Sequence, residues 1–509
     1  MEAVFGTKNL RNLEQLVKGS TKVEARFEMK VGIKRVLEVS AKCLGIELTR
    51  HENEVTLRGR VVSRIIYIDE TESFNSEERS DNFTEKLILK GAGVPVSLSP
   101  FAAVTESRLV EGGNPNFADV VTSVDISVLG LVSREVRFVS DIRGEVEVMK
   151  EVTRISSFGV NISNLFEIEE SIDLDKTCTG VLGTDVSAVL RDIVVGDGKV
   201  TVKGMASINV IAVKTSEGQS IYNDTIEFDF SKTISNKDIG LDDTITGAIS
   251  VNDLAVRVET KERVQLIVTA GLCFQGHVVS TQDVEQVLDA FSFTSGLNLV
   301  RTAVENVVAL PAHNTLLDVE GNLALPEKGA YVARVLSVGD VRVTAVNLVP
   351  TSDKVMVEGT LSASIVTECE EKQLQTHRVQ IPFSQSLRVD GLGSNHSIQT
   401  YVSVINCKVK ARRGKELLID ARVGLSLHAY AQDVRELITD ITATEPKQPD
   451  NSAILIYTVN ENETLWEIAK RTSVRREEII RQNPSAEMGI KAGDKIFIYR
   501  QERLDALRA

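Results

Sequence analysis

The sequence is poor in aromatic residues, has few cysteines and contains no long apolar run. Aromatic residues make up 5% of the chain, with a single tryptophan, so a protein that stacks single-stranded nucleic acid on aromatic side chains is disfavoured. The five cysteines are scattered without a C-x-x-C pair, which disfavours a zinc or dithiol site and indicates buried thiols in a reducing compartment. Nowhere do about 18 apolar residues run together, so we expect no membrane-spanning helix.

Positive charge and catalytic motifs are also scarce. Lys and Arg number 58 against 72 Asp and Glu, a net charge of −14, and an acidic chain repels nucleic-acid phosphates and anionic lipid. The six histidines are isolated, and the nucleophile-elbow, P-loop and H-E-x-x-H patterns are missing. The first thirty residues show no secretory signal. We therefore expect a cytoplasmic protein that is not an enzyme, holds no cofactor or metal, and binds no nucleic acid.

Three similar stretches recur along the 509 residues at long intervals. Each has alternating apolar residues, a glycine and a second apolar stretch: VTLRGRVVSRIIYI at 55–68, VTVKGMASINVIAV at 200–213 and VMVEGTLSASIVTE at 355–368. Their glycines, Gly59, Gly204 and Gly359, lie about 150 residues apart. A period of this length predicts three tandem domains, because solenoid repeats are much shorter.

Three further landmarks follow the glycine stretches in the same order. They are FTEKL at 83–87, FDFSK at 228–232 and IPFSQ at 381–385; then apolar strands through Gly130, Gly271 and Gly424; then VSD, VLD and ITD ending at Asp141, Asp289 and Asp440. If the repeats share one fold, the first three glycines occupy equivalent backbone positions. The same prediction applies to the second set of glycines.

The periodicity within each copy predicts strands. Apolar residues alternate with a period of two, Val, Ile and Thr are abundant, and turn-type clusters separate the runs at hairpin spacing. The predicted fold class is mainly β, with three antiparallel, sandwich-like repeat domains; one very large continuous sheet is the alternative. The expected divisions are repeats at 1–147, 148–296 and 297–441, a linker at 442–452, a small domain at 453–500 and a tail at 501–509.

The small C-terminal domain has the order strand, helix, helix, strand. Residues 455–459 form a β-branched and aromatic strand. Thr464 and Glu467 have capping-box spacing at the start of a helix that runs to about Lys470. A second helix at about 475–482 ends at Asn483-Pro484. The last strand is predicted at 495–499, so the domain is expected to fold as βααβ.

At these positions the sequence resembles the lysin motif, LysM. The resemblance rests on Tyr457-Thr458-Val459, residues 462–469, Ile479, Asn483-Pro484 and residues 490–498. Members of that family usually have Gly-Asp where this chain has Asn462-Glu463, in the loop that borders the family's N-acetylglucosamine groove. The resemblance implies a binding module, and this departure argues against glycan as its ligand.

The whole chain resembles the spore coat morphogenetic proteins of the SipL/SpoVID type, which combine tandem SPOCS repeats with a terminal LysM. The resemblance implies a non-enzymatic coat assembly scaffold in the mother-cell cytoplasm, at the forespore surface or spore coat. It implies that LysM docks to a SpoIVA-type basement-layer ATPase and that the repeats bind other coat proteins. The alternative is a peptidoglycan-binding protein of the cell wall or cortex, with the glycan as its ligand.

Two loops that flank the family's groove predict where the partner binds. The predicted partner-binding residues are Asn460, Asn462, Glu463, Thr464, Leu465, Trp466, Asn483, Pro484, Met488 and Ile490. Trp466 lies about 100° from the apolar stripe of its helix, at the edge of the small core. It is therefore either a partner anchor or a cap on that core. The nearby arginines, 471, 475, 476 and 481, form either a solvated face or a rim for an acidic partner.

Overall fold

Antiparallel strands form almost all of the protein. The structure is a computed structural model that describes residues 1–90, 93, 95–110, 114–215, 219–260, 264–325, 331–447 and 452–499. Within these ranges the helices are confined to the C-terminal module. The predicted fold class, mainly β with three tandem antiparallel repeats followed by a βααβ module, is therefore confirmed. None of the helices in the described ranges has the length and apolarity needed to cross a membrane.

Each repeat contains two antiparallel sheets built from one set of strands. Repeat one comprises β1 (Glu2–Glu28), β2 (Ile33–His51), β3 (Glu54–Asp69), β4 (Phe74–Ile88), β5 (Pro95–Val110) and β6 (Phe117–Arg143). Its sheets have the orders β1-β6-β5 and β2-β3-β4. The first and last strands therefore pair with each other, and the second, third and fourth strands form a separate meander.

Repeats two and three follow the same order of strands. Repeat two comprises β7 (Val146–Asp173), β8 (Cys178–Gly196), β9 (Lys199–Thr215), β10 (Gln219–Ser235), β11 (Thr244–Thr260) and β12 (Val264–Ser292). Repeat three comprises β13 (Ser295–Ala309), β14 (His313–Ala324), β15 (Val332–Thr351), β16 (Lys354–Cys369), β17 (Leu374–Arg388), β18 (His396–Arg412) and β19 (Glu416–Pro446). Its first strand is divided at Pro311, which has no N–H to donate to a ladder; both halves pair with β19.

The first set of glycines occupies equivalent positions in the three repeats, as predicted. Each lies in the middle strand of a meander, directly opposite a phenylalanine: Gly59 opposite Phe83, Gly204 opposite Phe230 and Gly359 opposite Phe383. A Cβ on Gly204 would lie 2.2 Å from the Phe230 ring. The ring therefore covers the glycine, and this explains why the two landmarks recur together.

The second set of glycines does not occupy equivalent positions, so that prediction is wrong. Gly271 lies opposite Asp253, next to a β-bulge in β11. The matching bulges in β5 and β18 lie opposite Ser123 and Arg422. Gly130 and Gly424 are elsewhere in their strands, and each accommodates its own neighbour: Leu16 approaches Gly130, and Val189 of repeat two approaches Gly424.

The aspartates near the ends of the last strands are equivalent. Asp141, Asp289 and Asp440 each follow a bulge in β6, β12 or β19. Each carboxylate accepts a hydrogen bond from the backbone N–H of the next residue at 2.9 Å. The fourth sequence landmark therefore marks a repeated local structure at the end of each long strand pair.

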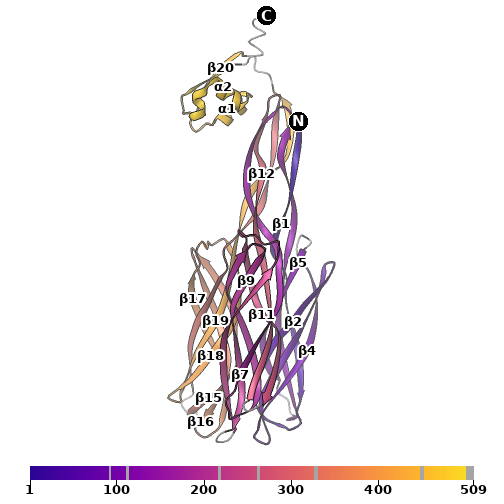
Figure 1. Cartoon of the computed structure of the whole chain (residues 1–509), viewed down its shortest axis with the longest axis vertical. Coiled ribbons are helices and arrows are strands. Elements are labelled where there is room, and N and C mark those ends of the chain that lie inside the picture. Colours follow the sequence, from indigo (N-terminus) through magenta and orange to yellow (C-terminus); the bar gives the residue numbers. More distant parts are fainter. Residues whose placement is uncertain are drawn as a thin grey trace.

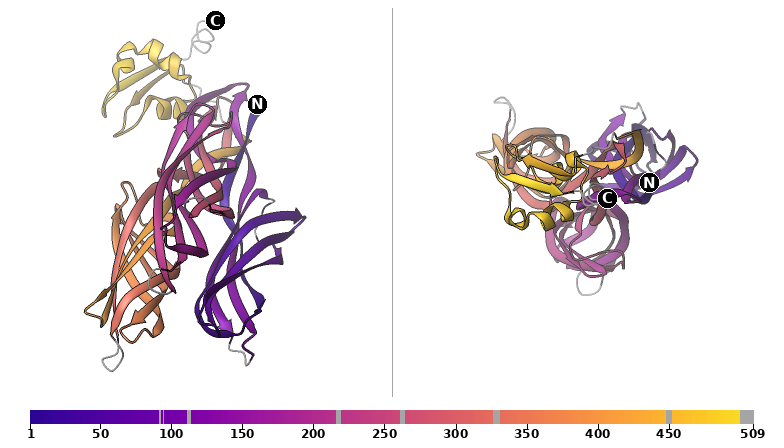
Figure 2. Two further views of the ribbon diagram at one scale, coloured as in Figure 1. Left: turned by 60° about the horizontal axis from the view of Figure 1, so that its bottom comes forward. Right: turned by 90° about the horizontal axis from the view of Figure 1, so that it is seen from above.

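The three repeats lie around a common axis and extend into one stalk. In Figure 1 the long strands rise above the three lobes toward the C-terminal module, and Figure 2 shows the lobes around a centre when seen from above. The stalk interior mixes side chains from all three repeats; one layer contains Phe138, Ile155, Val284, Val304 and Leu437. Further layers above and below have the same mixed origin.

Three leucines meet where the second sheets of the repeats converge. Leu37, Leu182 and Leu336 are buried, and each is the extra residue of a β-bulge in the second strand of its repeat. They belong to one apolar cluster with residues from all three repeats. Equivalent bulges thus turn equivalent side chains toward the axis.

A charged cluster lies beside these leucines. Arg64 Nη2 of repeat one is 2.6 Å from Asp185 Oδ2 of repeat two, and Lys42 also pairs with Asp185. Burial opposes ionisation of Asp185, but the charges of Arg64 and Lys42 outweigh it, and its pKa falls. Glu38 lies 3.6 Å from Arg64, too far for a normal hydrogen bond, and burial raises its pKa to about 7.

The last strand of the body runs further than the sequence predicted. Strand β19 ends at Pro446, and residues 442–446 belong to it and extend along β13. Five residues of the expected linker are therefore strand. Their polar, proline-containing composition predicted a linker, but they continue the pairing of β19 with β13 along the stalk. Residues 448–451 of the expected linker and the expected tail at 501–509 lie outside the described residues.

The C-terminal module has the predicted order of elements. It comprises β20 (Ile454–Thr458), α1 (Leu465–Thr472), α2 (Arg476–Gln482), the 3-10 helix η1 (Pro484–Met488) and β21 (Lys495–Tyr499). Strand β21 has the predicted bounds. Strand β20 pairs with β21 in a two-stranded antiparallel sheet.

Candidate partner-binding site

The module is organised around a small apolar core beneath its two helices. Ile468, Ala469, Ile479, Ile496 and Ile498 are fully or almost fully buried. The Thr464 side chain accepts a hydrogen bond from the Glu467 N–H, and the Glu467 carboxylate accepts one from the Thr464 N–H, which is the capping box expected from the sequence. The cap fixes the start of α1 and therefore the position of Trp466.

The Asn462-Glu463 loop is a tight turn in which Asn462 takes a left-handed backbone conformation. Asn462 has a φ of 57°, in the left-handed region where Gly is the most favoured residue and Asn is tolerated. The Glu463 carboxylate accepts hydrogen bonds from the Asn460 backbone N–H at 3.0 Å and from the Tyr457 hydroxyl at 2.6 Å. It is also 3.1 Å from Arg471. Both substitutions are therefore compatible with the tight turn.

The electrostatics of Glu463 follow from these partners. Burial opposes its ionisation, but the hydrogen bonds from Tyr457 and Asn460 and the charge of Arg471 outweigh burial and lower the pKa of the carboxyl. The side chain is only 5% exposed. Glu463 is thus paired with Arg471, and its buried carboxylate stabilises the loop through hydrogen bonds.

Asn483 is a structural residue of the module. Its Nδ2 donates hydrogen bonds to the carbonyls of Ile479 at 2.9 Å and Phe497 at 2.7 Å. Its Oδ1 accepts a hydrogen bond from the Phe497 N–H at 2.9 Å. The side chain is buried and joins the end of α2 to β21, so its polar atoms are already in use.

Trp466 lies at the edge of the module core, as its helical position predicts, but it faces repeat two of the same chain. Its Nε1 donates a hydrogen bond to Asp289 Oδ2 at 2.8 Å. Its ring lies 5.3 Å from the Phe291 ring at an angle of 65°. Lys470, one turn further along α1, also reaches Asp289, at 2.8 Å. The role of Trp466 as an anchor for another protein stays a prediction.

The remaining predicted residues differ in accessibility. Met488 is 91% exposed at the end of η1, and Pro484 is exposed at its start. Leu465 and Ile490 are half-buried against the module core. The accessible part of the predicted site is therefore the surface of the two loops, whereas Leu465, Ile490 and Asn483 support it from below.

The arginines near the helices divide between internal contacts and surface positions. Arg471 is held by Glu463, and Arg481 pairs with Glu478 on the same helix. The Arg475 guanidinium lies 5.6 Å from the centre of the Phe293 ring in repeat two. Arg476 is exposed at the start of α2. Three of the four thus have partners within the chain.

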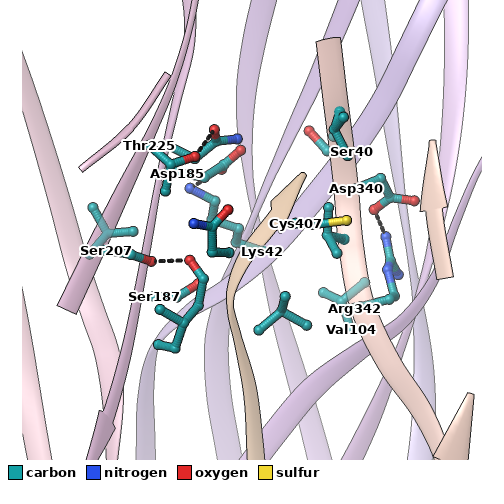
Figure 3. Close-up of a pocket in the computed structure, with 18 of the residues that line it drawn as sticks. Ser40, Lys42, Val104, Asp185, Ser187, Ser207, Thr225, Asp340, Arg342 and Cys407 are labelled. Atoms are coloured by element: carbon teal, nitrogen blue, oxygen red, sulfur yellow. Dashed lines mark hydrogen bonds and ion pairs between the residues drawn. The ribbon is translucent and has the colours of Figure 1, made fainter. Parts of the chain in front are cut away.

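A cavity of about 210 Å³ between the three repeats is a second candidate site, but it has less support as a binding site than the module. Figure 3 shows that Lys42 and Asp185 face each other on one side of it and Asp340 and Arg342 on another. The Ser207 hydroxyl spans two repeats by donating to the Ile405 carbonyl at 2.6 Å. The charges lining the cavity are therefore already paired, Lys42 with Asp185 between repeats one and two and Asp340 with Arg342 within repeat three. In the described ranges, no group of three or more His, Cys, Asp or Glu side chains is placed to hold a metal ion.

Sequence reasoning missed the residues that receive the module. Asp289 was visible as the repeated aspartate of the fourth landmark, but nothing marked it as a contact of Trp466, 177 residues further along the chain. Phe291 and Lys470 carried no signal of their own. A comparison of the three landmark ends, VSDIR, VLDAF and ITDIT, shows the one available hint, an aromatic residue in the second repeat alone.

Two protein families match parts of the chain. The SPOCS domain of SipL matches residues 332–412, which contain β15 to β18 of repeat three. The LysM domain matches residues 457–498. No curated protein matches the chain significantly. By strand order, the segments equivalent to the SPOCS match are β2 to β5 in repeat one and β8 to β11 in repeat two. Both matching families are non-catalytic binding domains.

Proposed function

The chain matches SipL-like, sporulation coat-associated proteins in having a SPOCS domain and a C-terminal, peptidoglycan-binding-type LysM domain, and from this premise we propose that it is a non-enzymatic scaffold of spore coat assembly. Its LysM module docks to a SpoIVA-type basement-layer ATPase. The repeats recruit other coat proteins. The protein acts in the mother-cell cytoplasm at the forespore surface.

The observation that carries this proposal is the placement of one binding module at the end of a body made of three interlocked repeats. The module lies at the stalk end, and the lobes lie at the opposite end (Figure 1). Such an arrangement separates one attachment point from a broad surface on the lobes. It supports a protein that connects a platform to further components.

We propose that the platform contacts the loop surface that includes Asn460, Pro484 and Met488, with Trp466 as the anchor beside it. An aromatic anchor at the centre of an interface typically contributes about 2 to 4 kcal/mol. Trp466→Ala should then weaken binding of the purified ATPase about 30- to 1000-fold. The exposed α2 residue Glu477 provides a control, because Glu477→Ala should bind like the parent.

The peptidoglycan alternative is compatible with the tight turn at Asn462-Glu463, in which Asn462 takes a left-handed conformation and Glu463 accepts a hydrogen bond from the Asn460 N–H. Retention on insoluble peptidoglycan, compared with co-purification of the ATPase, separates the two functions. Saturable retention on peptidoglycan with no binding of the ATPase would overturn the scaffold proposal. A folded Trp466→Ala protein that binds the ATPase at parent affinity would remove Trp466 from the interface.

A further inference from the structure

The LysM module is attached to the end of repeat two by more than the chain itself. The Asp289 carboxylate accepts hydrogen bonds from Trp466 Nε1 at 2.8 Å and from Lys470 Nζ at 2.8 Å. Its side chain is 18% exposed. Burial opposes ionisation of Asp289, but its bonds to Lys470 and Trp466 outweigh burial and lower its pKa. The contact is thus a paired, hydrogen-bonded carboxylate, the stronger class of polar interaction.

Phe291 adds an apolar contact beside this carboxylate. It is 2% exposed and belongs to the core cluster of the module, although it lies in β12 of repeat two. Its ring packs edge-on against Trp466, with centroids 5.3 Å apart, and against Phe293, 5.5 Å apart. Repeat two therefore supplies a side chain that completes the core of the module.

Lys447, at the end of the described body, adds a further link between repeat two and the module. Its Nζ donates to the Ser292 carbonyl at 2.9 Å and to the Ser473 hydroxyl at 2.9 Å. Ser292 belongs to repeat two, and Ser473 follows α1 of the module. The same lysine thus holds both partners.

The other two repeats offer no equivalent site. Asp141 and Asp440 occupy the position of Asp289 and make the same bond to the next N–H. Two residues after these aspartates, however, stand Arg143 and Thr442 in place of an aromatic ring. All three repeats have the aspartate, so it is a feature of the repeat itself. The aromatic residue is specific to repeat two, which receives the module.

We propose that the end of repeat two, Asp289 with Phe291, is a docking site for the chain's own LysM module and holds it in a closed state that withholds Trp466 from a partner. The docking itself stands on the contacts described above. The withholding rests on the proposed function, in which the partner binds through Trp466. A partner must then compete with Asp289 and Phe291 for the same indole.

The single tryptophan makes docking directly measurable in the full chain. In Asp289→Ala, the emission of Trp466 should shift to longer wavelength and its quenching by acrylamide should rise at least about twofold, because the indole loses its cover. Asp440→Ala removes the equivalent aspartate and should leave both signals unchanged. Hydrogen exchange of the α1 amides should show the same protection in all three proteins, which separates undocking from unfolding. Lys470→Ala should reproduce the effect from the side of the module.

Binding of the purified SpoIVA-type ATPase tests the withholding. The apparent Kd equals the intrinsic Kd divided by the fraction of open molecules, so Asp289→Ala should bind at least about fivefold more tightly than the parent, and Asp440→Ala like the parent. Unchanged fluorescence and quenching in both Asp289→Ala and Lys470→Ala would overturn the docking site. Changed fluorescence with unchanged affinity would overturn the withholding.

Trp466→Ala in the Asp289→Ala background identifies which hypothesis has failed. If this double variant binds the ATPase as tightly as Asp289→Ala does, the partner does not use Trp466, and it is the proposed anchor role of Trp466 that fails. If the double variant loses binding while Asp289→Ala binds no more tightly than the parent, the partner uses Trp466 but docking does not compete with it. Tighter binding of Asp289→Ala that is lost in the double variant supports both proposals.

Discussion

At the scale of single residues, Glu38 is a carboxyl group for which burial outweighs its partner. It is 3% exposed between repeats, and neither of its oxygens has a hydrogen-bond partner within the described part of the chain. The charge of Arg64 favours ionisation, whereas desolvation and the charge of Asp185 oppose it, and the pKa of Glu38 rises to about 7. Folding is thus linked to proton uptake by this group.

The pH dependence of stability follows from the sign of that shift. Between the unfolded pKa of about 4.3 and the folded pKa of about 7, the folded chain binds more protons than the unfolded one. The contribution of Glu38 to the free energy of unfolding is therefore present at low pH and decreases as pH rises through this window. Glu38→Gln removes this pH dependence and should be more stable than the parent at pH 8, by up to about 4 kcal/mol. Urea unfolding at pH 5 and pH 8 measures this. The exposed Glu47→Gln on β2 is the control, and equal pH slopes in Glu38→Gln and the parent would contradict the prediction.

The glycine–phenylalanine pairs predict a second effect at the residue scale. An added Cβ on Gly204 would lie 2.2 Å from the Phe230 ring and 2.4 Å from the Val189 carbonyl oxygen. Gly204→Ala should therefore lower the free energy of unfolding by about 2 to 3 kcal/mol. Gly180→Ala in β8, where an added Cβ has no neighbour within 4 Å, should change it by less than about 0.5 kcal/mol. Thermal and urea unfolding of the two variants provide the comparison, and similar values for both would show that the ring is not held in place.

At the scale of elements, the C-terminal module depends on polar ties as much as on its core. Asn483 connects the end of α2 to β21 through three hydrogen bonds, two to the main chain of Phe497 and one to that of Ile479. Because the side chain is buried, its removal leaves main-chain groups unsatisfied. The Asn-Pro signal that ends the helix in the sequence therefore also secures the sheet.

Asn483→Ala should destabilise the module by about 2 to 3 kcal/mol. Hydrogen exchange of the α2 and β21 amides at increasing urea concentrations follows the module directly, whereas the fluorescence of Trp466 would also report its undocking from Asp289. Ser485→Ala, an exposed neighbour in η1, should leave the midpoint unchanged. A midpoint for Asn483→Ala equal to that of the parent would show that water replaces the side chain without cost.

The sequence predicted local features and missed those that depend on distant neighbours. The Gly59 and Phe83 landmarks recur because each pair meets across one hairpin, so the pattern is local. Gly271 is not equivalent to Gly130 or Gly424. A glycine in a strand can accommodate either a β-bulge or a bulky neighbouring side chain, and the sequence does not distinguish these two causes. Trp466 and Asp289 are in contact although they lie 177 positions apart in the sequence. No local pattern in a single sequence indicates such a contact.

At the scale of the whole molecule, the repeats share their cores. Four apolar clusters take side chains from all three repeats, one at the axis and three in the stalk. Each repeat also has its own interior between its two sheets. A repeat alone would therefore expose the apolar faces that the other two now cover, and the body is expected to unfold as one unit.

Scanning calorimetry of the full chain tests this coupling. The β-body should give one transition whose calorimetric and van't Hoff enthalpies agree, separate from any transition of the module. A chain ending before repeat three, at Thr294, should lose stability throughout and expose surface that binds hydrophobic dyes. Three separable body transitions, each retained in that shorter chain, would contradict shared cores.

The length of the stalk strands determines the distance between the lobes and the end of the stalk. Strand β19 contains 31 residues, and at about 3.3 Å per residue it spans roughly 100 Å from the lobe hairpin to the end that carries the module. Neighbouring strands hydrogen-bond to β19 along most of this length. The backbone is already extended, so the length of the strand would change little under tension. The stalk thus keeps the three lobes at a fixed distance from its own end, so in an array of such molecules the lobes would all lie at the same height above the stalk ends.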